Sequence, residues 1–187
     1  MRHNIELMIP RLRSAGWRFS NSDVYPIWAP PHQKTTDQIA ELERRLKGPI
    51  SLALKTFWSV VGTVSFMRQP SGYDEDLSLP DPLVVGPVDH ALTELSDWED
   101  DEERRSEPFR APIAPDALHK DDISGGAPYE IALPDSAADT LLLNEPHDTT
   151  FVSYLRIALA AGGLPGWEDS ERHAPLLKRL ADGLQAF

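Results

Sequence analysis

Residues 35–66 read TTDQIAELERRLKGPISLALKTFWSVVGTVSF, and this stretch predicts two helices that lead into a strand. Thr35 is the expected cap of the first helix, because Gln38 three residues later completes a capping-box pattern. The apolar residues of this helix recur at three- and four-residue spacing and share one face: Ile39, Leu42 and Leu46. Gly48-Pro49 ends the helix, since glycine suits a left-handed cap and proline has no N–H with which to continue it.

The second half of the stretch predicts a more apolar helix, for which Ser51 can serve as the cap. Its wide apolar stripe consists of Leu54, Phe57, Trp58 and Val61. After Gly62, the residues Thr63-Val64-Ser65-Phe66 alternate as expected of a half-buried strand. An aromatic-rich helix that runs directly into a strand is typical of a protein core. We therefore expect this stretch to support the fold and not to carry chemistry.

Composition limits the classes of function that this chain can have. Its 187 residues suffice for one domain with a substantial core, and the absence of cysteine excludes disulfides, thiolate zinc sites and cysteine nucleophiles. With 30 acidic and 18 basic residues the formal net charge is −12, which repels nucleic acid and anionic membranes and favours basic partners or simple solubility. No apolar run could span a bilayer, and residues 1–20 lack the apolar core of a signal peptide. The sequence thus predicts no nucleic-acid partner, no membrane partner and a cytoplasmic location.

The remaining segments predict further helices and strands without an internal repeat. Helical periodicity marks three segments, of which the first is opened by Pro87: residues 88–98, 151–159 and 174–184. Short strands are expected at residues 82–85, 129–133 and 139–143. Residues 1–34 contain a short helical pattern, interrupted by Pro10, and then a proline-rich segment. They predict an arm packed on a domain that residues 35–187 form.

Four segments, taken in order, match a known pattern: ISLALKTFWSVVGTVSF (50–66), LPDPLVV (79–85), IAPDALHKDDISGG with YEIALP (113–134), and FVSYLRIALAAGGLPGW (151–167). The most characteristic parts are the FW..VG junction between helix and strand and the GG.PGW after the later helix. With these features the chain resembles the SUKH superfamily, the Smi/Knr-like group of domains. The resemblance covers residues 35–170.

This resemblance implies a single α+β domain with a mainly antiparallel sheet and helices packed on one side. Many bacterial members of the family are immunity proteins that bind and neutralise partner toxins, often nucleases, and others are regulatory or scaffold-like binding modules. The family has no catalytic constellation, so the resemblance implies no catalytic residues and no cofactor here. Trp17 and Trp28, in the N-terminal arm, have no counterpart in a minimal domain of this kind.

The strongest candidate for chemistry is a polar turn just ahead of Ser124-Gly125-Gly126, with Asp116, His119, Lys120 and Asp122. Histidine, lysine and carboxylates so close together can perform acid–base chemistry or bind an anion beside exposed backbone N–H groups. The spacing fits no P-loop. The favoured interpretation is a polar edge and turn in which Asp116 hydrogen-bonds its own backbone.

A second candidate is the acidic segment that consists of Trp98, Glu99, Asp100, Asp101, Glu102 and Glu103. An aromatic anchor rimmed by carboxylates suits a basic protein partner. The segment lacks the alternating ligands and the glycine of an EF-hand calcium loop. In the favoured interpretation, Trp98 simply completes the apolar stripe of the helix that starts at Val88.

Metal binding and nucleophilic catalysis are not predicted. The histidines His90, His119, His147 and His173 are scattered without HxxxH or HExxH spacing, and no GxSxG elbow occurs.

The first functional hypothesis is therefore a non-enzymatic binding protein, an immunity protein whose expected partner is a basic toxin domain. A housekeeping regulatory or scaffold module is the alternative, because both roles need only a stable surface. A third hypothesis is a small hydrolase that uses His119, Lys120 and Asp122, which requires the three side chains to share a concave pocket. The sequence determines neither the partner and the face that binds it nor the oligomeric state.

Overall fold

The fold is known from a computed structural model that describes residues 1–20, 24–69 and 78–187. Its α-helices are α1 (Arg2–Ser14), α2 (Gln33–Leu46), α3 (Leu52–Val60), α4 (Val88–Asp100), α5 (Phe151–Ala160) and α6 (Ala174–Ala181). Its strands are β1 (Trp28–Ala29), β2 (Thr63–Ser65), β3 (Val84–Val85), β4 (Arg110–Ala114) and β5 (Tyr129–Ala132). Three 3-10 turns complete the set: η1 (Arg104–Ser106), η2 (His119–Asp121) and η3 (Pro165–Trp167).

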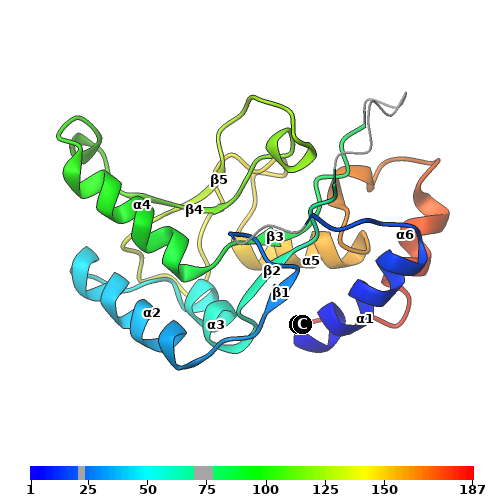
Figure 1. The fold of residues 1–187 in the computed structure, drawn as a ribbon, viewed down its shortest axis with the longest axis horizontal. Coiled ribbons are helices and arrows are strands. Elements are labelled where there is room, and N and C mark those ends of the chain that lie inside the picture. The colour runs from blue at the N-terminus through cyan, green and yellow to red at the C-terminus, as the bar shows by residue number, and fades with distance from the viewer. Residues whose placement is uncertain (21–23, 70–77) are drawn as a thin grey trace.

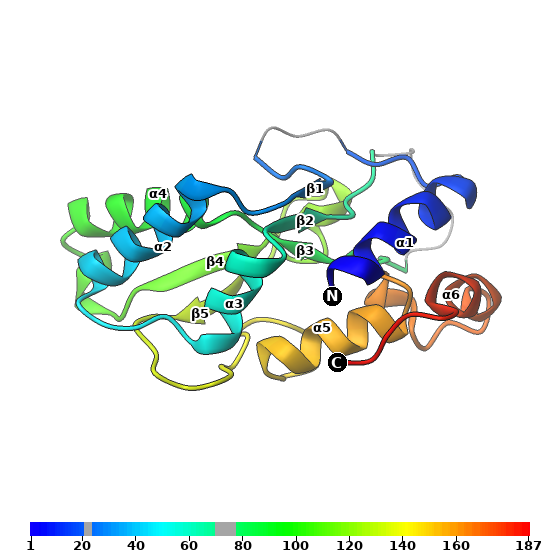
Figure 2. The same cartoon turned by 90° about the horizontal axis from the view of Figure 1, so that it is seen from below.

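The strands form two small antiparallel sheets, so the prediction of a single α+β domain with antiparallel pairing is confirmed. The first sheet has the order β1-β2-β3, and the second pairs β4 with β5. The two sheets adjoin, because the N–H of Gly86 donates to the carbonyl of Ile113 at 2.7 Å. Helices α2 and α4 pack together at one end of the molecule, while α1 and α6 pack together at the other (Figure 1). Helices α3 and α5 lie below the first sheet (Figure 2).

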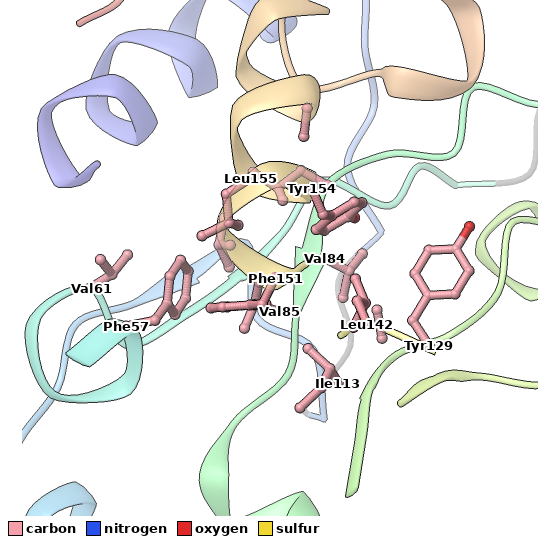
Figure 3. Packing of buried hydrophobic residues seen from close by; sticks show 14 of the residues in the cluster. Phe57, Val61, Val84, Val85, Ile113, Tyr129, Leu142, Phe151, Tyr154 and Leu155 are labelled. Carbon is pink, nitrogen blue, oxygen red and sulfur yellow. The ribbon is translucent and has the colours of Figure 1, made fainter. Parts of the chain in front are cut away.

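One hydrophobic core runs through the whole described chain. Figure 3 shows Phe151 and Tyr154 of α5 close to the two valines of β3, and Leu155 of the same helix is also buried. The ring of Phe57, from α3, meets the ring of Phe151 edge-on at 5.6 Å. The aromatic stripe of residues 54–61 is buried as predicted, and the indole N–H of Trp58 donates to the carbonyl of Gly86 at 2.9 Å. Residues 35–66 therefore do support the fold.

The caps of the two helices in this stretch differ from the prediction. Helix α2 begins at Gln33, before Thr35, and the Thr35 hydroxyl instead accepts the backbone N–H of His32 at 3.2 Å. Ser51 makes no capping hydrogen bond, because backbone carbonyls of residues 137 and 138 accept the first N–H groups of α3 at 3.1 and 2.9 Å. The cap of α2 thus pairs Thr35 with a residue before the stretch, and the cap of α3 comes from residues far outside it.

The end of α2 also differs in detail. The left-handed residue is Lys47, with φ 53°, and not Gly48. Gly48 is required for a different reason, since a Cβ at this position would lie 2.6 Å from the Cβ of Pro134.

Two strand predictions are corrected. Strand β2 was expected to be half-buried, but all three of its residues are buried, so both faces of this central strand are covered. The strand expected at residues 139–143 is reduced to isolated bridges, from Leu141 to Thr150 and from Leu143 to Glu130. Alternate residues of that segment pair with two different neighbours, so no continuous ladder forms.

The N-terminal residues contribute directly to the core and to a sheet. Pro10 does not break α1, which buries Ile5, Met8 and Leu12; we attribute its tolerance to this packing. Strand β1, from the expected arm, pairs with β2 through Trp28 and Ala29. Gly62 permits this close approach, because a Cβ there would lie 2.0 Å from the carbonyl oxygen of Ala29.

Candidate functional site

The predicted polar turn folds around the carboxylate of Asp116. Its Oδ1 accepts the backbone N–H groups of Leu118 and His119 at 2.9 and 3.3 Å, and its Oδ2 pairs with Nδ1 of His119. Burial alone would raise the pKa of Asp116, but these hydrogen bonds outweigh it and lower the pKa. A Cβ at Gly126 would lie 2.5 Å from this carboxyl group, which explains the glycine in the turn.

The structure separates the four residues that the sequence placed together. Asp116 and His119 stay paired, with the imidazole half exposed at the surface. Asp122 is exposed and adopts the left-handed conformation at φ 61°. Lys120 turns the other way, into the protein, because it lies on the opposite side of the short η2 turn. The three side chains of the hydrolase hypothesis therefore do not share a pocket.

Lys120 is the centre of a buried polar cluster that the sequence did not predict. Its side chain is 0% exposed, and its Nζ lies 2.6 Å from Oδ1 of Asp81. The hydroxyl of Tyr129 donates to the other carboxylate oxygen of Asp81 at 2.9 Å. The ammonium also lies over the ring of Tyr129, 4.3 Å from its centroid, and 5.9 Å from that of Tyr154. Both contacts are cation–π interactions of a desolvated cation.

Burial dominates the titration of this cluster. It lowers the pKa of Lys120, although the neighbouring carboxylate of Asp81 opposes the shift. Burial and the Asp81 charge raise the pKa of both Tyr129 and Tyr154, so the two phenols stay protonated. The cluster joins η2, β5 and the segment before β3, and we interpret it as a structural element of the fold.

A second polar bridge lies next to this cluster. The side chain of Glu145 is fully buried and pairs with Nδ1 of His147, whose Nε2 lies 2.6 Å from Oε1 of Glu168. Burial would lower the pKa of His147, but hydrogen bonds to Glu145 and Glu168 raise it above its ordinary value. The imidazole thus ties the loop after residue 143 to the end of η3.

Helix α4 packs on β4, and a polar cleft of about 350 Å³ opens between residues of α4 and η1 and residues of the β4–β5 sheet. One wall carries His90, Glu94 and Arg104, and the other carries Arg110, Glu130 and the Asp116–His119 pair. We name it the α4 cleft.

The acidic segment at the end of α4 is only partly engaged in the fold. Trp98 is half-buried, with its indole N–H donated to the carbonyl of Arg104 at 2.9 Å and its ring edge-on to Phe109. Glu99 pairs with Arg45 at 2.5 Å, and Oδ1 of Asp101 accepts backbone N–H groups of the following turn.

The other three carboxylates of the segment, those of Asp100, Glu102 and Glu103, are exposed. The Glu102 side chain is 94% exposed and lies 3.9 Å from Arg105. Trp98 therefore completes the helix stripe, in agreement with the favoured interpretation, and these three acids are left on the surface.

Two further observations concern the described residues as a whole. No three histidine, aspartate or glutamate side chains among them are placed to hold a metal ion. None of the helices they form has the length and apolar character that crossing a membrane requires.

The sequence did not single out Asp81, Glu145 or His147 as members of a shared site. Asp81 stands between two prolines, and its positive φ of 42° is the only local peculiarity of its backbone. His147 was one of several scattered histidines, and its partner Glu168 lies 21 residues away.

Comparison with known proteins identifies no relative: no family model, no curated protein and no solved structure matches this chain.

Proposed function

We propose that this chain is a non-enzymatic protein-binding domain that recognises a basic partner through the acidic segment at the end of α4. The observation that carries the proposal is the exposure of Asp100, Glu102 and Glu103 in one turn beside a half-buried tryptophan. This turn forms one extremity of the molecule, where a partner can approach it (Figure 1). None of the three carboxylates accepts a hydrogen bond from the described residues, and the 3.9 Å contact of Glu102 with Arg105 is the one ion pair among them that a partner would displace.

The role that we propose for this binding is immunity to a toxin. It is supported by the resemblance of residues 35–170 to the SUKH superfamily and by the net charge of −12. Opposite charge accelerates association and suppresses wrong partners, and both effects weaken as salt rises. A basic toxin domain is the class of partner that best fits an acidic surface of this kind. A housekeeping interaction module would use the same surface without a toxin.

Neutralising the three exposed acids is expected to weaken partner binding. The variant Asp100→Asn/Glu102→Gln/Glu103→Gln should lower the affinity for a basic toxin encoded beside this gene by about tenfold at low salt, mainly through slower association. Calorimetry and association kinetics at two salt concentrations measure this effect, and growth of cells that express the toxin measures protection.

The matched control is Asp169→Asn/Glu171→Gln/Asp182→Asn, which changes the net charge equally at three exposed residues near α6. It should leave affinity within about twofold of the wild type. An equal loss of affinity in both variants would show that only the net charge of the protein matters. That result would contradict a defined binding face at the end of α4. Binding without protection would favour the housekeeping module over immunity.

A further inference from the structure

The α4 cleft has walls of matched composition. The α4 side contributes Glu94, followed by Arg104 at the start of η1, and the sheet side contributes Arg110 and Glu130. The Asp116 carboxylate on the sheet side is already occupied by its own turn and by His119. Apart from this pair and His90, each wall offers one guanidinium and one carboxylate to the same small space. Three prolines fill the lining between them, and proline has no N–H with which to bond these charges: Pro112, Pro115 and Pro128.

The charges in this cleft leave most of their hydrogen-bonding capacity unused. The closest approach of Arg104 to Glu94 is 3.6 Å, which is too long for a hydrogen bond. Within the part of the chain that the structure describes, the exposed guanidinium of Arg110 forms no hydrogen bond or salt bridge. Glu130 accepts one long bond, from Asn144 at 3.3 Å. A guanidinium has five N–H donors and a carboxylate about four acceptor sites, so both kinds of group can bind a ligand.

We infer that the α4 cleft binds a small zwitterion, a molecule in which one carbon carries both an ammonium and a carboxylate group, such as a free α-amino acid. Its carboxylate would meet Arg104 and Arg110, and its ammonium would meet Glu94 and Glu130. The two charges of such a ligand are close together, as are those of the Arg104–Glu94 pair, so the ligand can lie antiparallel beside this pair with each charge next to its opposite. A ligand with a single charge would be attracted by the two cleft groups of opposite charge, but it would also be repelled by the two groups of its own sign.

The cleft also has the size and electrostatic character for this ligand. Its volume of about 350 Å³ is at the lower end of the range for small-molecule sites. Burial and the charge of Glu94 raise the pKa of Glu130, although Arg110, Asn144 and Arg104 oppose the shift. Burial and the same Glu94 charge raise the pKa of Tyr25 to about 12. An ammonium group beside Glu94 would relieve this negative potential.

A titration with three matched probes tests the inference. Alanine, acetate and methylammonium chloride are added at constant ionic strength while backbone amide signals are followed by NMR. Alanine is expected to shift the signals of residues 90, 94, 110 and 130 saturably, with an affinity roughly tenfold or more above that for either single-charge probe. Absence of a saturable shift would overturn the inference, as would equal responses to all three probes.

Two single variants locate the ligand. Glu94→Gln and Arg110→Gln should each weaken alanine binding about fivefold or more, because each removes one of the opposed charges. Both side chains are at the surface, so unchanged thermal unfolding will show that the fold is intact. Glu171→Gln, an exposed acid outside the cleft, should have no effect. Unchanged binding in both cleft variants would contradict the assignment, whether or not the acidic segment binds a partner.

Discussion

Replacing Lys120 with alanine is expected to lower the free energy of unfolding by about 3–5 kcal/mol, because it leaves a buried charge without its partner. The Asp81 side chain is only 4% exposed, and it would keep a single donor, the hydroxyl of Tyr129. The substitution also removes the cation that lies over two tyrosine rings. Urea unfolding monitored by circular dichroism measures this loss.

Two controls separate the buried charge from other effects of this substitution. Lys178→Ala removes an exposed lysine and should change stability by less than about 0.5 kcal/mol. The double variant Lys120→Met/Asp81→Asn removes both charges and retains much of the side-chain volume, so it should regain most of the lost stability. A cost below about 1 kcal/mol for Lys120→Ala would contradict a dry, buried ion pair at this position.

Replacing His147 with glutamine is expected to cost about 2 kcal/mol at pH 6, since two charge-assisted hydrogen bonds disappear. Both ring nitrogens face carboxylate oxygens, and an ionised carboxylate can only accept. The imidazole must therefore be doubly protonated to make both bonds. Without the imidazolium of His147, the buried carboxylate of Glu145 loses the only positive charge that its own loop supplies.

The effect of this substitution should depend on pH. The folded-state pKa of His147 is raised above its ordinary value of 6.5, so the stabilisation is complete below that pH. It is lost as the pH rises through the folded-state pKa, and the stabilities of wild type and variant should then converge. Urea unfolding between pH 6 and 9 measures this, with the exposed His3→Gln as the control that should show no such trend. A difference that grows with pH would contradict a charged His147.

The helices of this fold could largely be predicted from local patterns in the sequence, whereas strands β1 and β4 were not predicted. The apolar periodicity of residues 88–98 and the preceding Pro87 correctly placed the start of α4. The sequence could not show that the cap of α3 comes from carbonyls of residues 137 and 138, because this depends on a contact between distant segments. The same holds for the residues between 139 and 143, which bridge to two different neighbours.

The candidate sites were less predictable, because their chemistry depends on which way each side chain points. His119 and Lys120 are adjacent in the sequence, yet one reaches the surface and the other is buried. The spacing of apolar residues cannot show which of these two side chains is buried, because η2 is too short to have a periodic pattern. Asp81, the partner that holds Lys120 inside, lies 39 residues away. The exposure of Asp100, Glu102 and Glu103 could be expected from the sequence, since a run of solvent-facing charge needs no distant contact to form.

The burial of Lys120 also gives the five lysines of this chain different reactivities toward amine-acylating reagents. Lys34, Lys47 and Lys178 are exposed and Lys55 is partly exposed, so a brief treatment of the native protein should acylate these four. The Lys120 amine, enclosed by Asp81 and two tyrosine rings, should be spared and should react only when the domain opens. Mass spectrometry of the acylated peptides would then report the opening rate of the domain at a single residue.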